Sequence, residues 1–191
     1  DAMHRAPGKL ALGVAFDGDG DRLGVVDERG AIVSPDHLLM LLADDVLART
    51  PGATIIADVK TSDHFFARVS ARSGTPLMWK TGHAHIKTKL AETGAKFAGE
   101  ASGHLFFADD YFGYDDALYA AMRLLRIVAE SGQSLSAMVA ALPPIFASPE
   151  LRIPCADTLK FAAIEALQAR FPNGSMLDGV RVSTPQGWWL V

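Results

Sequence analysis

Residues Thr54–Thr93 read TIIADVKTSDHFFARVSARSGTPLMWKTGHAHIKTKLAET, and two kinds of pattern alternate along them. Thr54–Val59 is a short β-branched run that predicts a strand, and Leu77–Lys80 predicts another. Asp63–Ser73, between these strands, and His83–Thr93, after them, are predicted to be helices. Alternation of strand and helix is typical of a parallel sheet covered by helices, so we expect an α/β fold.

The same alternation extends over the whole of Ile32–Leu142. Upstream, the apolar spacing of Asp36–Arg49 predicts a helix. Downstream, Phe97–Ala98 and Leu105–Phe107 resemble short strands around a loop, and Asp115–Glu130 is the strongest helical pattern of the chain. We therefore expect a mixed or parallel sheet with helices on both faces.

Two further units are expected outside this region. On the N-terminal side, strands over Leu10–Phe16 and Leu23–Asp27 flank the polar loop Asp17–Arg22. On the C-terminal side, Pro143-Pro144 and Pro149 mark a linker. Beyond the linker an α+β pattern follows, with the segment Glu150–Ile153, one helix and two strands, the last three at Asp157–Phe171, Val180–Ser183 and Gly187–Val191.

The composition disfavours several classes of function. Of the 191 residues, 49% are hydrophobic and 21% charged, with a formal net charge of -4 and no dense Lys/Arg run. That balance is typical of a globular protein and argues against a nucleic-acid or anionic-membrane partner. No apolar stretch approaches the roughly 18 residues of a membrane span. Cys155 is the single cysteine, so no internal disulfide is possible and a cytoplasmic location is expected.

The ends of the chain suggest a segment of a longer polypeptide. Termini usually lie at the surface and carry polar or flexible residues. This chain instead stops at Gly187–Val191, within an apolar stretch that reads as a strand. An unusual domain that ends in a strand is the alternative interpretation.

The loop Asp17–Arg22, with sequence DGDGDR, carries carboxylates at alternate positions, Asp17, Asp19 and Asp21. The intervening glycines reach backbone angles closed to other residues, so all the carboxylates can point at one place. Converging carboxylates repel one another unless a cation lies between them, and hard oxygen ligands select Mg²⁺ or Ca²⁺. Arg22, a permanent planar cation, suits a phosphate oxygen beside the metal. A solvated acidic turn is the alternative.

The same loop imitates a calcium-binding EF-hand. Counted from Asp17, positions 1, 3 and 5 are Asp and position 12 is Glu28. Position 6, where an EF-hand needs glycine for its sharp turn, is Arg22. The flanking segments are also apolar and β-branched rather than helical, so an EF-hand is disfavoured.

A second polar loop, Gly99–His104 with sequence GEASGH, carries a carboxylate, a hydroxyl and an imidazole. Glu100 beside Ser102 offers what recognition of vicinal sugar hydroxyls requires. His104 can act as an acid or a base near neutral pH. An ordinary loop between strands is the alternative.

A third segment, Lys80–Lys87 with sequence KTGHAHIK, opens a predicted helix after a strand. Free N–H groups at a helix N-terminus, with Lys80, His83 and Lys87 nearby, form a plausible anion site. Lys60 follows the strand Thr54–Val59 and belongs to the same end of the sheet, where open α/β sheets bind ligands. For any single one of these residues, an ordinary surface position is the alternative.

The motifs Asp17–Arg22, Lys80–Lys87 and Gly99–His104, in this order, resemble those of the α-D-phosphohexomutases, bacterial phosphomannomutase/phosphoglucomutase in particular. The resemblance runs along nearly the whole chain and includes the Asp115-Asp116 pair that opens the longest helix. Members of the family have four domains around a central cleft.

The resemblance implies both a domain division and an activity. Residues 1–30 would end domain two and carry the metal loop, residues 31–143 would form the sugar-binding domain three, and residues 144–191 would begin domain four. Members interconvert hexose 6-phosphates and hexose 1-phosphates of mannose, glucose or both. An active-site phosphoserine donates its phosphoryl group, and the hexose 1,6-bisphosphate formed reorients before it returns the other phosphate.

Roles for individual residues follow from the same resemblance. One Mg²⁺ would be held by the acidic loop, with Arg22 helping to neutralise charge during phosphoryl transfer. Glu100 and Ser102 would bind the sugar hydroxyls. Lys60 and His104 would line the cleft as catalytic proton-transfer partners, with substrate also bound by two residues of the helix-opening motif, Gly82 and His83.

This sequence departs from the family pattern in two respects. It contains neither the phosphoserine loop nor the phosphate-binding loop of domain four. The expected partners are therefore a hexose phosphate and the N-terminal and C-terminal parts of the same polypeptide. By itself the segment is expected to be inactive.

Two other classes of function stay open on the residues alone. A non-catalytic module that binds Mg²⁺ and a sugar phosphate uses the same loops, and the absence of a nucleophile favours it. A hydrolase with a nucleophilic Asp in the acidic loop fits less well, because the metal leaves no carboxylate of that loop free.

Overall fold

The computed structural model describes residues 9–191. Its centre is a sheet in the order β4 (Thr75–Trp79), β3 (Thr54–Asp58), β5 (Phe97–Gly99) and β6 (Leu105–Phe107). β3 pairs in parallel with both β4 and β5, whereas β6 returns antiparallel to β5 through the turn that carries the GEASGH motif. The predicted mixed or parallel sheet is confirmed.

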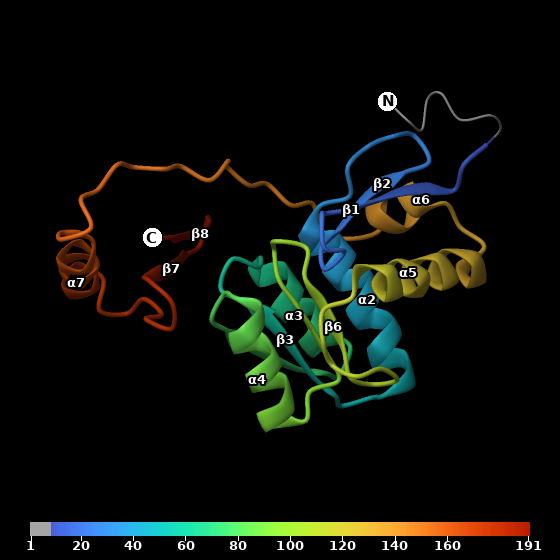
Figure 1. The fold of residues 1–191 in the computed structure, drawn as a ribbon, viewed down its shortest axis with the longest axis horizontal. Coiled ribbons are helices and arrows are strands. Elements are labelled where there is room, and N and C mark those ends of the chain that lie inside the picture. The colour runs from blue at the N-terminus through green and yellow to red at the C-terminus, as the bar shows by residue number, and fades with distance from the viewer. Residues whose placement is uncertain (1–8) are drawn as a thin grey trace.

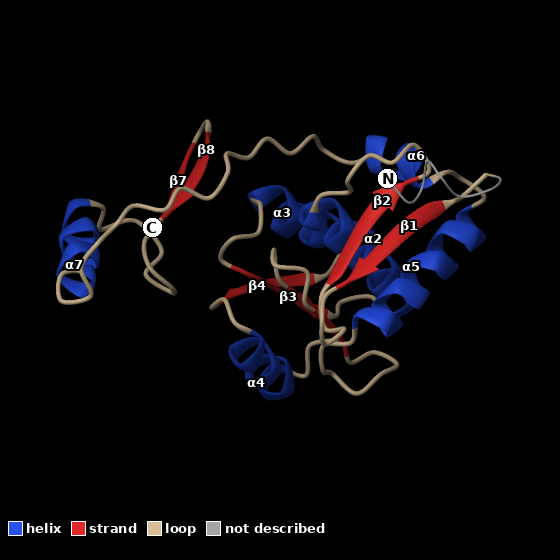
Figure 2. Ribbon diagram, turned by 45° about the horizontal axis from the view of Figure 1, so that its top comes forward, coloured by secondary structure: helices blue, strands red, loops and turns tan. Residues whose placement is uncertain are grey.

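Helices cover both faces of this sheet (Figure 2). α2 (Pro35–Arg49), α3 (Asp63–Ala71) and α5 (Ala117–Ser131) contribute to the larger core cluster on one face, and α4 (His83–Thr93) packs on the other. Side chains of a strand alternate between faces, so in β3 one neighbouring isoleucine faces each layer.

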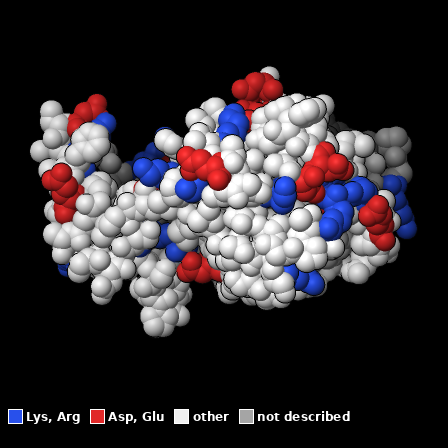
Figure 3. All heavy atoms as spheres, turned by 90° about the horizontal axis from the view of Figure 1, so that it is seen from below, with Lys and Arg blue, Asp and Glu red and all other residues white. Residues whose placement is uncertain are grey.

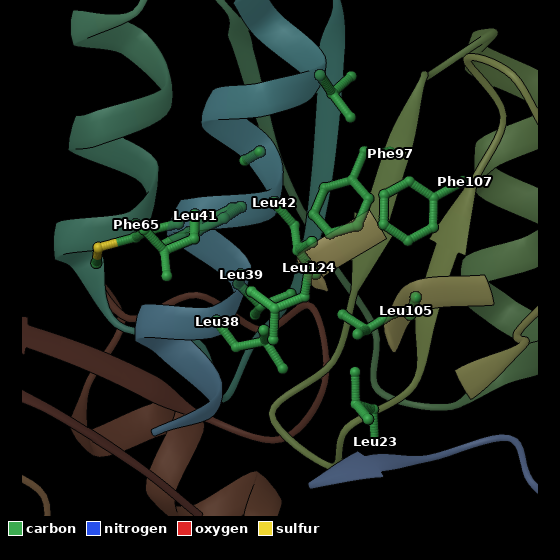
Figure 4. Close-up of a cluster of buried hydrophobic side chains, with 14 of the residues drawn as sticks. Leu23, Leu38, Leu39, Leu41, Leu42, Phe65, Phe97, Leu105, Phe107 and Leu124 are labelled. Atoms are coloured by element: carbon green, nitrogen blue, oxygen red, sulfur yellow. The ribbon is translucent and has the colours of Figure 1, made fainter. Parts of the chain in front are cut away.

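The larger core is built around α2, a helix that is buried nearly all round. Six consecutive residues of α2, 38–43, are buried, and Leu39 and Leu42 belong to the same cluster as Phe97 and Phe107 of the sheet (Figure 4). A helix surrounded by apolar neighbours needs no polar face. Leu124 of α5 belongs to the same cluster and is drawn beside Leu39 and Leu42 (Figure 4).

Most predicted elements are confirmed, with small corrections at their ends. Asp116 caps α5 by accepting a hydrogen bond from the Tyr119 N–H at 2.9 Å, so the helix begins at Ala117 and not at Asp115. α3 ends at Ala71, two residues before the predicted end, because Ser73 adopts φ 61° and the chain turns away.

β1 (Leu12–Phe16) and β2 (Leu23–Asp27) form a separate antiparallel hairpin around the acidic loop, as predicted. Two polar contacts join the far end of this hairpin to α6 (Leu135–Ala140), because Glu28 accepts hydrogen bonds from the backbone N–H and the hydroxyl of Ser136.

The C-terminal part follows a long connection without helix or strand over residues 143–156 (Figure 1). It contains α7 (Lys160–Arg170), which begins three residues after the predicted start, and the antiparallel pair β7 (Arg181–Thr184) and β8 (Gly187–Leu190). Arg181 attaches this part to the central domain.

Residues 9–191 contain no helix with both the length and the hydropathy needed to cross a lipid bilayer. On the face seen in Figure 3, acidic and basic side chains are interspersed among uncharged ones.

Candidate functional site

The acidic loop connects β1 to β2 and gathers its three carboxylates. One oxygen from each of Asp17, Asp19 and Asp21 lies within 4.8 Å of the others. Gly20 adopts φ 77°, the left-handed conformation that the loop needs to turn its side chains inward. The clustering that the alternate spacing predicted is therefore present in the fold.

Arg22 holds the first of these carboxylates. Its backbone N–H and its Nε donate to Asp17 at 3.1 Å and 2.6 Å, and the Asp21 N–H donates to Asp17 at 3.2 Å. Burial pushes the pKa of Asp17 upward, but the hydrogen bonds and charge of Arg22 outweigh it and lower that pKa to about 2. Asp17 is thus ionised under all ordinary conditions.

Asp21 is in the opposite situation. Its Oδ1 is buried and accepts no hydrogen bond from residues 9–191. Burial raises the pKa of Asp21, and the charges of Asp17 and Asp19 raise it further, although His104 opposes them. An orphaned carboxylate oxygen beside two like charges is what a bound cation would satisfy.

The residues of this loop therefore fit a divalent metal ion. Oxygen donors alone, with repulsion between them, suit a hard cation such as Mg²⁺. The side chains of Asp17, Asp19 and Asp21 would hold it, although one oxygen of Asp17 is already engaged by Arg22 Nε.

The backbone brings the acidic loop to the GEASGH loop. The Leu23 N–H donates to the Gly103 carbonyl at 3.1 Å, and Arg22 pairs with His104 as a single antiparallel bridge. Gly103 has φ 100°, and a Cβ at that position would lie 3.2 Å from the Leu23 carbonyl oxygen. Glycine at this position allows the close approach.

Glu100 is the centre of a second cluster. Its Oε1 accepts the Gly82 N–H at 2.5 Å and its Oε2 accepts the Ser102 hydroxyl at 3.0 Å. The residue is only 2% exposed. A carboxylate has about four lone-pair positions, so two stay available for hydroxyls of a ligand. Glu100, Ser102 and Gly82, predicted from separate motifs, are thus brought together.

His104 is held by a neighbour outside its own loop. Its Nδ1 lies 2.9 Å from Asp115 Oδ2, and Lys87 Nζ donates to the other oxygen of Asp115 at 3.0 Å. Burial alone would raise the pKa of Asp115, but Lys87 and His104 lower it below the ordinary value. The ring of His83 stacks on that of His104, with centroids 5.8 Å apart.

Lys60 is less closely associated with these residues. No hydrogen bond or ion pair within residues 9–191 joins it to the other candidates, and its Nζ lies 3.8 Å from the exposed Glu150. It follows β3 at the sheet edge that also carries Gly82 and Glu100, so it belongs to the same side of the domain.

A cavity of about 450 Å³ adjoins the two loops, between the β1–β2 hairpin and the start of α2. Its polar lining comes from Asp17, Arg22, Glu100 and Ser102, and most of its remaining lining is apolar. The acidic loop and the GEASGH loop therefore share one hollow.

Sequence reasoning missed two carboxylates of this region. Asp115 was noticed only as part of the pair that opens the longest helix, and its contact with His104 depends on the β6–α5 connection. Asp58 was included in the predicted strand Thr54–Val59 without a role of its own, yet it is fully buried and accepts hydrogen bonds from three different loops.

Fold and site together define an α/β protein in which a loop of three clustered carboxylates lies beside a loop that carries a buried glutamate and a serine hydroxyl. Residues 34–146 match the model of phosphoglucomutase/phosphomannomutase, alpha/beta/alpha domain III. The chain belongs to the phosphoglucomutase/phosphomannomutase family, as its motifs suggested.

Related proteins match along nearly all of the chain. The phosphomannomutase/phosphoglucomutase of Pseudomonas aeruginosa is 51% identical over 184 residues, which cover 94% of this chain and 40% of the relative. The phosphoglucomutase of Neisseria gonorrhoeae is 43% identical over 190 residues, or 96% of this chain and 41% of the relative. The chain thus spans about two fifths of the length of these relatives.

A crystal structure of a phosphoglucomutase/phosphomannomutase family protein from Burkholderia thailandensis has the same fold. The two superpose with a TM-score of 0.89 at 44% sequence identity, covering 99% of this chain and 40% of the other.

Proposed function

We propose that this chain supplies the metal-binding and sugar-recognition loops of a phosphohexomutase. The reaction would interconvert hexose 6-phosphate and hexose 1-phosphate, of mannose, glucose or both, through an active-site phosphoserine and a bisphosphorylated sugar. The observation that carries the proposal is the meeting of the acidic loop and the GEASGH loop through the Leu23–Gly103 hydrogen bond.

The proposal includes a division of labour along the polypeptide. Residues 1–30 carry the metal loop and belong to a second domain, residues 31–143 form the sugar-binding domain, and residues 144–191 begin a fourth domain. The phosphoserine and the loop that clamps the distal phosphate come from parts of the enzyme outside this sequence.

The acidic loop would hold Mg²⁺ through Asp17, Asp19 and Asp21. When bound, the ion supplies positive charge that stabilises the transferring phosphoryl group. Arg22 keeps the carboxylate of Asp17 ionised, and its partly exposed guanidinium can also attract a phosphate oxygen.

The remaining residues bind and orient the sugar phosphate. Glu100 and Ser102 accept from and donate to adjacent hydroxyls, which lets either end of the substrate be presented to the phosphoserine. His83 and Lys60 attract its phosphate, and the free N–H groups at the start of α4 after Gly82 add to this attraction. His104 moves a proton at the ring nitrogen that does not face Asp115, with Lys60 as its partner in proton transfer.

A non-catalytic module that binds Mg²⁺ and a sugar phosphate is the second candidate. One observation favours it: the Ser102 hydroxyl donates to Glu100, and both residues belong to the sugar-binding cluster, so this pair has a binding role that needs no nucleophile. This function needs the same loops but no phosphoserine.

Titration calorimetry on the 191-residue chain tests the binding part of the proposal. We expect Mg²⁺ to bind, and the D19N variant to weaken Mg²⁺ affinity at least about tenfold because it removes one charged ligand. D157N is the matched control, since the Asp157 side chain is 93% exposed and far along the chain. Equal Mg²⁺ affinity for D19N and D157N would contradict the metal assignment.

Glucose 6-phosphate gives the parallel test for the sugar loop. We expect the E100Q variant to weaken its affinity about tenfold, because the amide offers fewer acceptor positions than the carboxylate. E130Q is the control, since the Glu130 side chain is 68% exposed on α5. If E100Q binds glucose 6-phosphate as tightly as E130Q does, Glu100 has no role in sugar recognition.

A further inference from the structure

We propose that Asp58 is the positioning residue of the sugar-phosphate site: one buried carboxylate that fixes the three loops carrying Lys60, Gly82–His83 and Glu100–Ser102. The proposal rests on the proposed function for the meaning of those loops. It adds a residue that contacts no substrate in that function and acts through others.

Each of the three loops donates a hydrogen bond to Asp58. Its Oδ1 accepts the Thr61 hydroxyl at 2.8 Å and the Ala101 N–H at 3.3 Å, and its Oδ2 accepts the Thr81 hydroxyl at 3.3 Å. Each donor lies within one residue of a candidate ligand-binding residue: Thr61 follows Lys60, Thr81 precedes Gly82, and Ala101 separates Glu100 from Ser102.

The position of Asp58 in the sheet makes this arrangement possible. It is the last residue of β3, which lies between β4 and β5. The chain leaves the sheet after each of these parallel strands at the same edge, so loops from all three converge there. A side chain at the end of the middle strand is the one that can reach all of them.

Burial increases the cost of losing the hydrogen bonds that Asp58 accepts. Asp58 and Thr61 are both 0% exposed, so water cannot replace the hydrogen bond between them, and the donors Thr81 and Ala101 are half-buried. A buried carboxylate without donors is costly, and each loop is therefore held in the place where its donor meets Asp58. The short hydrogen bond from Gly82 N–H to Glu100 then links two of the positioned loops directly.

The competing explanation is that Asp58 only stabilises the fold. Rates of amide hydrogen exchange distinguish this explanation from a role in positioning the loops. If Asp58 only fills the interior, its loss weakens all of the sheet alike. If it positions the loops, the amides of residues 60–62, 81–83 and 100–102 become mobile while those within β3 and β5 stay protected.

The experiment compares the 191-residue chain with its D58A and D58N variants by amide hydrogen exchange and glucose 6-phosphate titration. We expect D58A to speed exchange in the three loops and to weaken glucose 6-phosphate binding, each by at least about tenfold. Mg²⁺ binding at the acidic loop should change less than about twofold, because the hydrogen bonds that Asp58 accepts come from Thr61, Thr81 and Ala101, which lie outside that loop.

D58N should recover much of the lost affinity. An asparagine oxygen can still accept from Ala101 and Thr61, and the Thr81 hydroxyl can rotate to accept from the amide. If Asp58 only fills volume, D58A and D58N differ in stability. Once folded, both variants would then bind glucose 6-phosphate as tightly as the parent chain does, and there would be no loss of affinity for D58N to recover.

Two threonine variants keep the test decisive if D58A does not fold. T61V and T81V each remove one hydroxyl while keeping the side-chain shape, and T88V removes a hydroxyl that donates to the Ala84 carbonyl on the exposed side of α4. T61V and T81V should speed exchange in their own loops, and T88V should not.

The proposal is overturned if amide hydrogens in the three loops exchange no faster in D58A than in the parent chain. It is equally overturned if T61V and T81V exchange no faster in their loops than T88V does. A uniform rise in exchange across the sheet would also overturn it. If the parent chain itself fails to bind glucose 6-phosphate, the proposed function fails, and the exchange results still decide the role of Asp58.

Discussion

At the scale of single residues, the acidic loop is organised by the protein before any ligand is present. Arg22 engages Asp17, leaving Asp19 exposed and Asp21 with one orphaned oxygen. Three carboxylates in one loop therefore have three different environments. Arg22 Nε lies 2.6 Å from Asp17 and 3.7 Å from Asp21, so Asp19 is the carboxylate of the loop that this guanidinium neutralises least.

The pKa of Asp17 tests this arrangement. In metal-free buffer, the ¹³C resonance of its carboxyl should titrate with a midpoint of about 2. Because this pKa lies below the ordinary 3.8, the ionised Asp17 carboxylate, held by the backbone N–H and the guanidinium of Arg22, stabilises the fold fully above pH 3.8, and this contribution is lost as the pH falls through about 2. The R22M variant should return the midpoint of Asp17 toward 3.8.

R29M is the control for R22M. Arg29 pairs with Asp27 at the other end of the same hairpin, at 2.9 Å, so its loss removes a comparable ion pair. It should leave the titration of Asp17 unchanged. A midpoint of Asp17 that stays near 2 in R22M would show that backbone hydrogen bonds, and not the guanidinium, set this pKa.

Some residue-scale features could be predicted from the sequence and others could not. The grouping of Asp17, Asp19 and Asp21 is local, so alternate spacing and glycines suffice to predict it. The contacts of Asp115 with His104 and of Asp58 with Ala101 join residues that are 11 and 43 positions apart. No local pattern signals such pairs, because they depend on where separate elements pack.

At the scale of elements, α2 lies so close to the sheet that β5 must end in glycine. A Cβ built on Gly99 would lie 2.0 Å from Leu39 Cδ2 and 3.2 Å from Leu105 Cδ2. Both leucines are buried and tightly surrounded, so neither can move away freely. The packing of helix on sheet beneath the GEASGH loop thus requires the absence of a side chain.

The G99A variant should therefore be destabilised by about 1–3 kcal/mol, because overpacking forces neighbours off their preferred positions. Urea unfolding monitored by circular dichroism measures the free energy of unfolding. G24A is the control, since a Cβ on Gly24 of β2 meets Ala15 at an ordinary 3.8 Å. Equal stability of G99A and G24A would show that α2 is not held against β5 as described.

Element types were more predictable than element ends. Alternation of β-branched runs with helical spacing was enough to predict β3, β4 and α4, because each buries a regular face. The predicted end of α3 was wrong because Ser73 adopts the left-handed conformation that glycine usually adopts. The antiparallel return of β6 was also beyond local pattern, since strand direction depends on the connecting turn.

At the scale of the whole molecule, Arg181 makes most of the hydrogen bonds that attach the C-terminal part to the central domain. The Arg181 guanidinium donates to the Val59 and Thr61 carbonyls at 3.0 Å and 3.2 Å and to Asp63 at 2.8 Å. It also lies 4.3 Å from the centre of a Trp188 ring. The Thr81 N–H also donates to Asp178 at 2.9 Å, so the C-terminal part is bonded to the segments that follow both β3 and β4.

Replacing this arginine should release the C-terminal part. Hydrogen bonds to a charged group contribute about 1.5–3 kcal/mol, so R181M should favour the undocked state at least about tenfold. Limited proteolysis within residues 143–156 should then become faster, and the radius of gyration from small-angle X-ray scattering should increase. R152M is the control, because the Arg152 side chain is 90% exposed. Identical scattering of R181M and R152M would rule out Arg181 as the attachment.

A chimera tests the central claim most directly. This chain would replace the matching two fifths of the Pseudomonas aeruginosa phosphomannomutase/phosphoglucomutase, to which it is 51% identical, and conversion of glucose 1-phosphate to glucose 6-phosphate would be measured. The account predicts turnover by the chimera, loss of at least about a hundredfold in its D19N variant, and none by this chain alone. A folded chimera that binds Mg²⁺ and glucose 6-phosphate without turnover, or turnover by this chain alone, would contradict it.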